Sequence, residues 1–166
     1  LIRLQNGGLY PAGIDHVVKG KNGTPGQLAG FVQLGTENKL GDIRNNTSLG
    51  ITGVISNEQY QFQEDKSCAV GCKQDVKKGK ASILCQLGDK VQEYEVEIEK
   101  INLSSEDNKG MEIHVTDPEL LKKAGGIVQG MSGAPLLQDG KCIGAVTHVF
   151  VRDVTRGYAT FLENML

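Results

Sequence analysis

Short stretches of alternating apolar and polar residues recur along the chain and predict a mainly β protein. Residues 94–98 place Tyr, Val and Ile between glutamates, and residues 111–115 repeat the pattern with Met, Ile and Val. Successive side chains of a strand point to opposite faces, so both stretches predict half-exposed strands. Further strands are predicted over residues 1–5, 8–19, 27–34, 40–46, 50–55, 80–87, 135–138 and 141–151.

Turn and helix signals separate these strands. Lys19-Gly-Lys-Asn-Gly-Thr-Pro-Gly is glycine-rich and basic but lacks phosphate-loop spacing, so it predicts a hairpin turn. Asp139-Gly140 predicts a second hairpin turn. Asp117 is placed as the N-cap of one short helix, with Pro118 at its first position and Gly125 at its end.

Composition and charge narrow the classes of function. The 166 residues carry 22 glycines, no Trp and a net charge of -2, which fits one turn-rich β domain. The small negative net charge disfavours nucleic-acid binding. No apolar run is long enough to cross a bilayer. The chain begins with Leu1 rather than Met, so we expect a processed product or a fragment of a longer protein.

The four cysteines predict no metal site and leave the disulfide question open. Cys68 and Cys72 have loose metal-ligand spacing without a second pair or a nearby His, so no metal or other cofactor is expected. A Cys68–Cys72 disulfide would form only in an oxidising compartment. Cys85 and Cys142 lie in apolar stretches that predict buried free thiols.

Gly130-Met-Ser-Gly-Ala-Pro is the segment with the clearest chemistry. Glycines on both sides of Ser132 permit a tight turn that exposes the hydroxyl group. The backbone N–H groups of Gly130 and Ser132 could then form an oxyanion hole, as in the G-x-S-G-x-P arrangement of chymotrypsin-like peptidases. A Gly-Ser turn without catalytic function remains an alternative.

A wider resemblance includes this motif. Residues 125–151, the ending Arg156-Gly-Tyr-Ala-Thr-Phe-Leu and the segments that begin at Lys19, Leu40 and Gly50 resemble the SpoIVB family of sporulation serine peptidases. The resemblance implies a chymotrypsin-like double β-barrel, incomplete at the N-terminus of this chain, and no metal. It implies an exported protein that cuts a membrane-bound regulator between the two cells of a developing spore. A PDZ domain usually precedes the peptidase domain in this family.

The resemblance also assigns residues. Ser132 falls on the family's nucleophile and Asp117 on its acidic catalytic residue. The family's catalytic His lies before the strand that begins this chain, so residues 1–166 are expected to be the C-terminal part of the peptidase domain and nearly inactive alone. His16 is the alternative base within the chain, and His148 either shapes the specificity pocket or is a core residue. His114 is expected to lie on an exposed strand face.

Two function classes therefore stand side by side. The first is a serine endopeptidase of sporulation signalling, which cleaves a membrane-associated regulator and its own chain. The alternative is a catalytically silent β module that binds a peptide along a sheet edge. An incomplete first barrel would leave an unpaired strand edge, so self-association is expected as well.

Overall fold

The computed structural model describes residues 7–58, 60 and 67–166. Their backbone forms short strands, one α-helix of two turns and three single-turn 3₁₀-helices. The strands and the helix are β1 (Gly7–Leu9), β2 (Ala12–Val18), β3 (Gln27–Val32), β4 (Gly41–Thr47), β5 (Gly50–Ile55), β6 (Ala69–Val70), β7 (Gly79–Gln86), β8 (Val91–Ile101), β9 (Met111–Val115), α1 (Pro118–Ala124), β10 (Pro135–Gln138), β11 (Lys141–Val149) and β12 (Arg156–Phe161). The 3₁₀-helices are Thr36–Asn38, Lys73–Asp75 and Leu162–Asn164.

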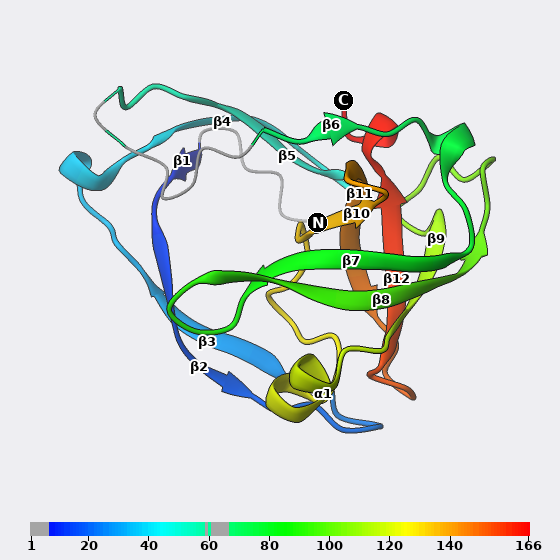
Figure 1. Ribbon diagram of the computed structural model, residues 1–166. Coiled ribbons are helices and arrows are strands. Elements are labelled where there is room, and N and C mark those ends of the chain that lie inside the picture. The colour runs from blue at the N-terminus through cyan, green and yellow to red at the C-terminus, as the bar shows by residue number, and fades with distance from the viewer. Residues whose placement is uncertain (1–6, 59, 61–66) are drawn as a thin grey trace.

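Six antiparallel strands in the C-terminal part close into a barrel (Figure 1). Their order is β7-β8-β9-β12-β11-β10, and β10 pairs with both β11 and β7, which completes the circle. The short β6 runs parallel to β11 outside this circle. A mainly β fold with one short helix ahead of the nucleophile loop is therefore confirmed, and the closed barrel agrees with the chymotrypsin-like expectation.

The predicted alternation produces the barrel interior. Tyr94, Val96 and Ile98 on β8 are no more than 2% exposed, while the glutamates between them face out. Phe161 and the inward residues of β9 complete the same apolar core. Burying each such side chain contributes roughly 1.5–3 kcal/mol.

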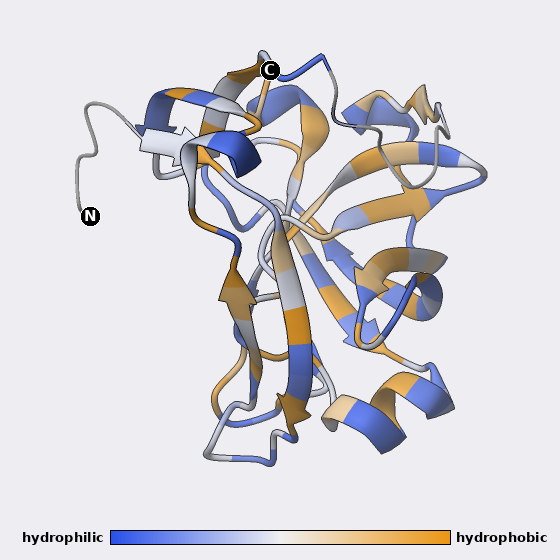
Figure 2. Ribbon diagram, turned by 90° about the vertical axis from the view of Figure 1, so that its left-hand side faces the viewer, coloured by the Kyte–Doolittle hydropathy of each residue, from blue (hydrophilic) through white to orange (hydrophobic). Residues whose placement is uncertain are grey.

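Five strands ahead of the barrel form two separate sheets, which we call the N-terminal ribbons. One sheet has the order β1-β4-β5, and β2 and β3 form the other. The ribbons lie to one side of the barrel in Figure 1, and Figure 2 colours their apolar residues orange along the backbone. Several of these large apolar residues are exposed. Phe31 is 57% exposed, Leu34 is 71% exposed and Ile51 is 52% exposed. Among the described residues, this half has no closed barrel.

The glycine-rich turn between β2 and β3 attaches the β2–β3 ribbon to the barrel. Lys21 and Thr24 form the bridge that the hairpin prediction requires. The N–H of Gly20 donates to the carbonyl of Ala124 at the end of α1, at 2.8 Å. The N–H of Gly23 donates to the carbonyl of Val151, also at 2.8 Å. This turn, residues 19–25, is called the docking loop below.

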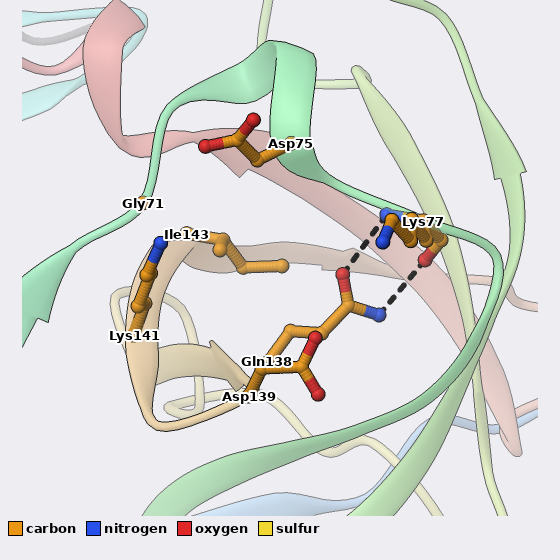
Figure 3. A pocket seen from close by; sticks show the side chains of 7 residues that line it. All are labelled: Gly71, Asp75, Lys77, Gln138, Asp139, Lys141 and Ile143. Atoms are coloured by element: carbon orange, nitrogen blue, oxygen red, sulfur yellow. Dashed lines mark hydrogen bonds between the residues drawn. The ribbon is translucent and has the colours of Figure 1, made fainter.

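The barrel closes through a short seam between β10 and β7. Only Leu136 and Leu137 pair with β7. The buried Gln138 amide extends the seam: its Oε1 accepts the N–H of Lys77 at 2.9 Å, and its Nε2 donates to the carbonyls of Lys77 and Lys80 (Figure 3). The Gln138 side chain therefore continues the hydrogen bonding between β10 and the β7 side of the barrel beyond the point where main-chain pairing ends.

Some sequence-based boundaries were wrong. The strand predicted over residues 8–19 is interrupted at Pro11, which lacks the N–H that a sheet needs, and becomes β1 and β2 in different sheets. The two-residue β6 was missed because so short a strand leaves no periodic pattern. The strand predicted over residues 1–5 lies outside the described residues.

Candidate active site

Ser132 occupies a tight turn between the segment after α1 and strand β10. Gly130 has φ +100° and Gly133 has φ +91°, which are left-handed values that favour glycine. Ser132 is exposed, and its hydroxyl donates to the carbonyl of Thr147 at 2.8 Å. The sequence motif therefore folds into the kind of turn that leaves the serine oxygen accessible.

A buried anchor holds this turn against the barrel. Met131, which precedes the serine, is 1% exposed and packs into the core. The N–H of Gly133 donates to the carbonyl of Val146 on β11 at 2.8 Å, and the N–H of Ala134 donates to Met131 at 2.9 Å. The serine is thus exposed on a turn whose neighbours are fixed on both sides.

The amides of Gly130 and Ser132 remain available for a ligand. The N–H of Met131 between them donates to the carbonyl of Val128 at 3.2 Å. Neither flanking N–H donates to an acceptor within the part of the chain that the structure describes. Unpaired main-chain donors beside a nucleophile are the groups from which an oxyanion hole is built.

The β2–β3 ribbon contacts the start of this turn directly. Leu28 of β3 donates its N–H to the carbonyl of Gln129, whose own N–H donates to Gly26, both at 2.8 Å. The Leu28 side chain also packs on Gly130, where an added Cβ would lie 3.1 Å from Leu28 Cβ. This contact joins segments about a hundred residues apart, and no local pattern in the sequence predicts it.

Two pockets meet at Ser132. The larger, with a volume of about 470 Å³, lies between the serine and the β4–β5 turn and is lined by Thr47, Ile51 and Asn108 among others. The second, of about 310 Å³, lies between residues 127–130 and the end of β11. Ser132 and His148 line both pockets. The pocket of Figure 3, at the opposite end of the β10–β11 hairpin, contains neither residue.

Asp117 lies at the N-terminus of α1, where the capping pattern predicted it. Its Oδ1 accepts the N–H groups of Glu119 and Leu120, each at 2.9 Å, and its Oδ2 accepts the N–H of Glu95 at 3.3 Å. The prediction of an N-cap is confirmed. The residue lines neither pocket at Ser132, so the structure does not bring it together with the serine.

The three histidines lie in different places. His16 is on the exposed face of β2 and pairs with its neighbour Asp15 at 2.9 Å. His114 is on β9, half-exposed as the alternation predicted, with Nδ1 3.6 Å from a carboxylate oxygen of Glu99. Of the three, only His148 lines the pockets at Ser132.

The family model described as SpoIVB peptidase S55 matches residues 1–166, the whole length of the chain. The chain belongs to the SpoIVB peptidase S55 family. In general terms it is a sporulation serine peptidase, and its substrates are proteins. Neither a curated protein nor a solved structure matches the chain.

This S55 peptidase also has site neighbours that the sequence did not reveal. Thr147 donates its hydroxyl to the carbonyl of Asn108 at 2.6 Å, which ties the β11 wall to the loop after β8. Asp107 in that loop has its pKa held below the ordinary value, chiefly by the Ser105 hydroxyl and then by the Lys109 N–H, with a small contribution from His148. Neither residue belongs to a recognisable motif, because the tertiary fold alone places them beside the pocket.

The cysteines of this S55 peptidase are free thiols. Cys68 and Cys72 are exposed and unbridged, and Cys85 is buried as predicted. Burial raises the pKa of the Cys85 thiol to about 11. Cys142 is half-buried rather than buried, because it lies on the outer face of β11 beside β6. Within the described ranges, no three His, Cys, Asp or Glu side chains are grouped to hold a metal, and no helix is long and apolar enough to cross a membrane.

Proposed function

We propose that Ser132 is the nucleophile of a serine endopeptidase and that the amides of Gly130 and Ser132 bind the oxyanion. One observation supports this most strongly: Ser132 is exposed on a turn where its own N–H and that of Gly130 have no main-chain acceptor among the described residues, in a chain of a serine peptidase family. Attack by Oγ on a peptide carbonyl would break the peptide C–N bond, release the C-terminal product as an amine and leave an acyl-enzyme ester, which water then hydrolyses to a carboxylate.

The proposed mechanism needs a base that the neighbourhood of Ser132 does not offer in its present form. The serine hydroxyl donates to the main-chain carbonyl of Thr147, and no His among the described residues, His148 included, forms a hydrogen bond with it. We therefore assign the base to a His outside residues 1–166, as the family resemblance implies. Loss of one triad member reduces kcat by about 10⁴-fold or more, so the 166-residue chain alone should be nearly inactive.

The proposed substrate is a membrane-bound regulatory protein, and self-cleavage is a second proposed reaction. Both come from the family resemblance, as does the proposed location in the space between the two cells of a developing spore.

The decisive experiment compares full-length protein with its Ser132→Ala variant on a casein-derived peptide mixture and on its own chain. The change should abolish cleavage, because it removes the attacking oxygen. Ser104→Ala is the matched control, since Ser104 is an exposed serine that lines neither pocket. Undiminished cleavage by Ser132→Ala would rule out the proposed nucleophile.

A catalytically silent peptide-binding module is the second candidate function. It is favoured by one observation, the lack of a base bonded to Ser132. A fluorophosphonate probe separates the two candidates in full-length protein, because the probe labels only an activated serine. Labelling at Ser132 supports the peptidase, whereas peptide binding without labelling supports the module.

We also propose self-association through the N-terminal ribbons. Phe31, Val32 and Leu34 expose more than half of their surface at the β3 end of one ribbon. Exposed apolar strand edges favour pairing with another chain. Sedimentation of the 166-residue chain over a range of concentrations should show a rising average mass, and a purely monomeric profile would contradict the proposal.

A further inference from the structure

The smaller pocket at Ser132 has a chemistry that restricts what can enter it. We propose that this pocket receives an uncharged aliphatic side chain, that of the substrate residue whose carbonyl Ser132 attacks, and that Pro25 of the docking loop forms the wall that sets this preference. The inference rests on the proposed peptidase function, since it names the substrate class of the same site.

The position of the pocket follows from the residues that line it. It shares Ser132 and Gly130 with the proposed oxyanion hole. A carbonyl carbon held at Ser132 Oγ, with its oxygen toward the Gly130 N–H, is bonded directly to the Cα that carries the side chain of the same residue. Of the two pockets at the serine, only this one includes Gly130 in its lining. The side chain on the carbonyl side of the scissile bond is therefore directed here.

The lining is mainly apolar, with Gln129, Ser132, Thr147 and His148 as its polar members. It contains no Asp, Glu, Lys or Arg, and His148 is its one titratable side chain. A charged side chain would lose hydration on entry without gaining an opposite charge, which costs several kcal/mol. Aliphatic walls come from Pro25, Ile127, Val128, Val146, Val149 and Val151.

The volume of the pocket also limits the size of the side chain that can enter it. About 310 Å³ lies at the lower end of the ~300–1,000 Å³ range of small-ligand pockets, which suits one side chain of modest size. Ile127 and Val128 are each 2% exposed and packed in the core, so these two residues do not move aside to make room for an aromatic side chain.

The docking loop supplies the remaining wall, which gives its glycine-rich motif a role. Main-chain hydrogen bonds on either side of Pro25 fix its position. The N–H of Gly23 donates to the carbonyl of Val151, and the carbonyl of Gly26 accepts the N–H of Gln129. The loop's first cation points elsewhere, because Lys19 Nζ donates to the carbonyl of Lys122 on α1 at 3.0 Å. The loop thus brings a rigid apolar ring, and not a charge, to the pocket.

The first test measures binding without catalysis. Acetyl-Ala-Ala-X peptides with a free carboxylate, where X is Val, Leu, Lys or Glu, are titrated into the 166-residue chain and followed by backbone amide NMR shifts. The Val and Leu peptides should bind at least tenfold more tightly than the Lys and Glu peptides, with shifts at Gly130, Ser132 and Val149. Equal affinities, or shifts confined to Thr47–Ile51 around the larger pocket, would overturn the inference.

A specificity switch gives the second test. Val151 is 57% exposed at the pocket rim, so Val151→Asp should fold and place a carboxylate there. The affinity for the Lys peptide should rise about tenfold or more relative to the Val peptide. Val151→Asn, which has the same shape without the charge, should give no such gain. An unchanged Lys-to-Val ratio in Val151→Asp would contradict the assignment.

Pro25 is tested by Pro25→Ala, which removes part of the wall. The ratio of Leu to Val affinity should rise several-fold, and an unchanged ratio would remove Pro25 from the proposal. Measuring kcat/KM in full-length protein for substrates that differ in the same residue X separates the pocket proposal from the peptidase proposal. Cleavage that needs Ser132 but shows no preference rejects the pocket, whereas selective peptide binding without any cleavage rejects the peptidase.

Discussion

The barrel and the N-terminal ribbons are built from similar strand sequences but hold together in different ways. In the barrel, Tyr94, Met111 and Phe161 are almost completely buried, and each strand is paired along both of its edges. In the ribbons, Phe31 and Ile51 remain more than half exposed, and the sheets have two and three strands. An isolated two-stranded hairpin is only marginally stable in water.

The difference shows where stability and specificity reside. The barrel holds the closed, buried core, whereas the β2–β3 ribbon is attached by the backbone bonds of its docking loop and by Val17 and Leu28. Main-chain bonds of this ribbon also reach Gln129, beside the pocket at Ser132. A ribbon with few buried contacts therefore shapes a site whose serine turn is held by the barrel. The first two experiments below test this division directly, and the other two concern the barrel side.

Two Phe→Ala changes give the largest contrast. Phe161→Ala empties a fully buried barrel position and should lower the free energy of unfolding by about 3–5 kcal/mol. Phe31→Ala removes a side chain that is 57% exposed and should change it by less than about 1 kcal/mol. Urea unfolding followed by circular dichroism measures both, and similar losses would erase the distinction between barrel and ribbon.

Leu28→Ala weakens the contact between the two regions. Leu28 is half-buried against the barrel core and Gly130, so we expect a loss of about 1–2 kcal/mol, less than for a fully buried leucine. Hydrogen exchange should accelerate in β2 and β3 but not in β8. Equal acceleration in both regions would show that ribbon and barrel unfold as one unit.

Asp117 provides a test with two matched variants. Asp117→Ala removes the N-cap of α1 and should cost about 1 kcal/mol, while Asp117→Ser, which keeps a capping oxygen, should restore most of it. If capping is the residue's main role, Asp117→Ser should also keep most of the activity of full-length protein. A stable Asp117→Ser protein with kcat reduced about 10⁴-fold would instead place Asp117 in the catalytic triad.

Acid pH should have the smallest effect. The pKa of Asp153 is lowered, chiefly by the Thr155 hydroxyl, relative to its ordinary value of 3.8. A lowered pKa in the folded state stabilises the fold above pH ~4, and this contribution is lost as the pH falls through the folded pKa. Because the carboxylate is largely exposed, we expect about 0.5 kcal/mol or less. Asp153→Asn should flatten the dependence of urea midpoints on pH between about 4 and 2, and an unchanged slope would contradict this origin.

The sequence predicted most of the barrel because its alternation and its turns are local signals. Strands β7 to β11, the helix capped by Asp117 and the Asp139-Gly140 turn follow from neighbours in the chain, whereas β12 was not predicted as a strand. The site was predicted only in part. The Ser132 turn depends on glycines next to it, but the pocket walls at Pro25 and Thr47 come from segments more than eighty residues away. Such contacts follow from packing between sheets, which alternation does not encode.

The seam that Gln138 fastens has a mechanical consequence. A closed sheet has no free edge at which to fray, so it must open first where the fewest bonds break together. Strand β10 meets β7 at two register positions and is held beyond them by one amide side chain. Under a pulling force, the sheet should unroll from this line. The turn that carries Ser132 leads straight into β10, so this turn would lose its shape at the first step of unrolling.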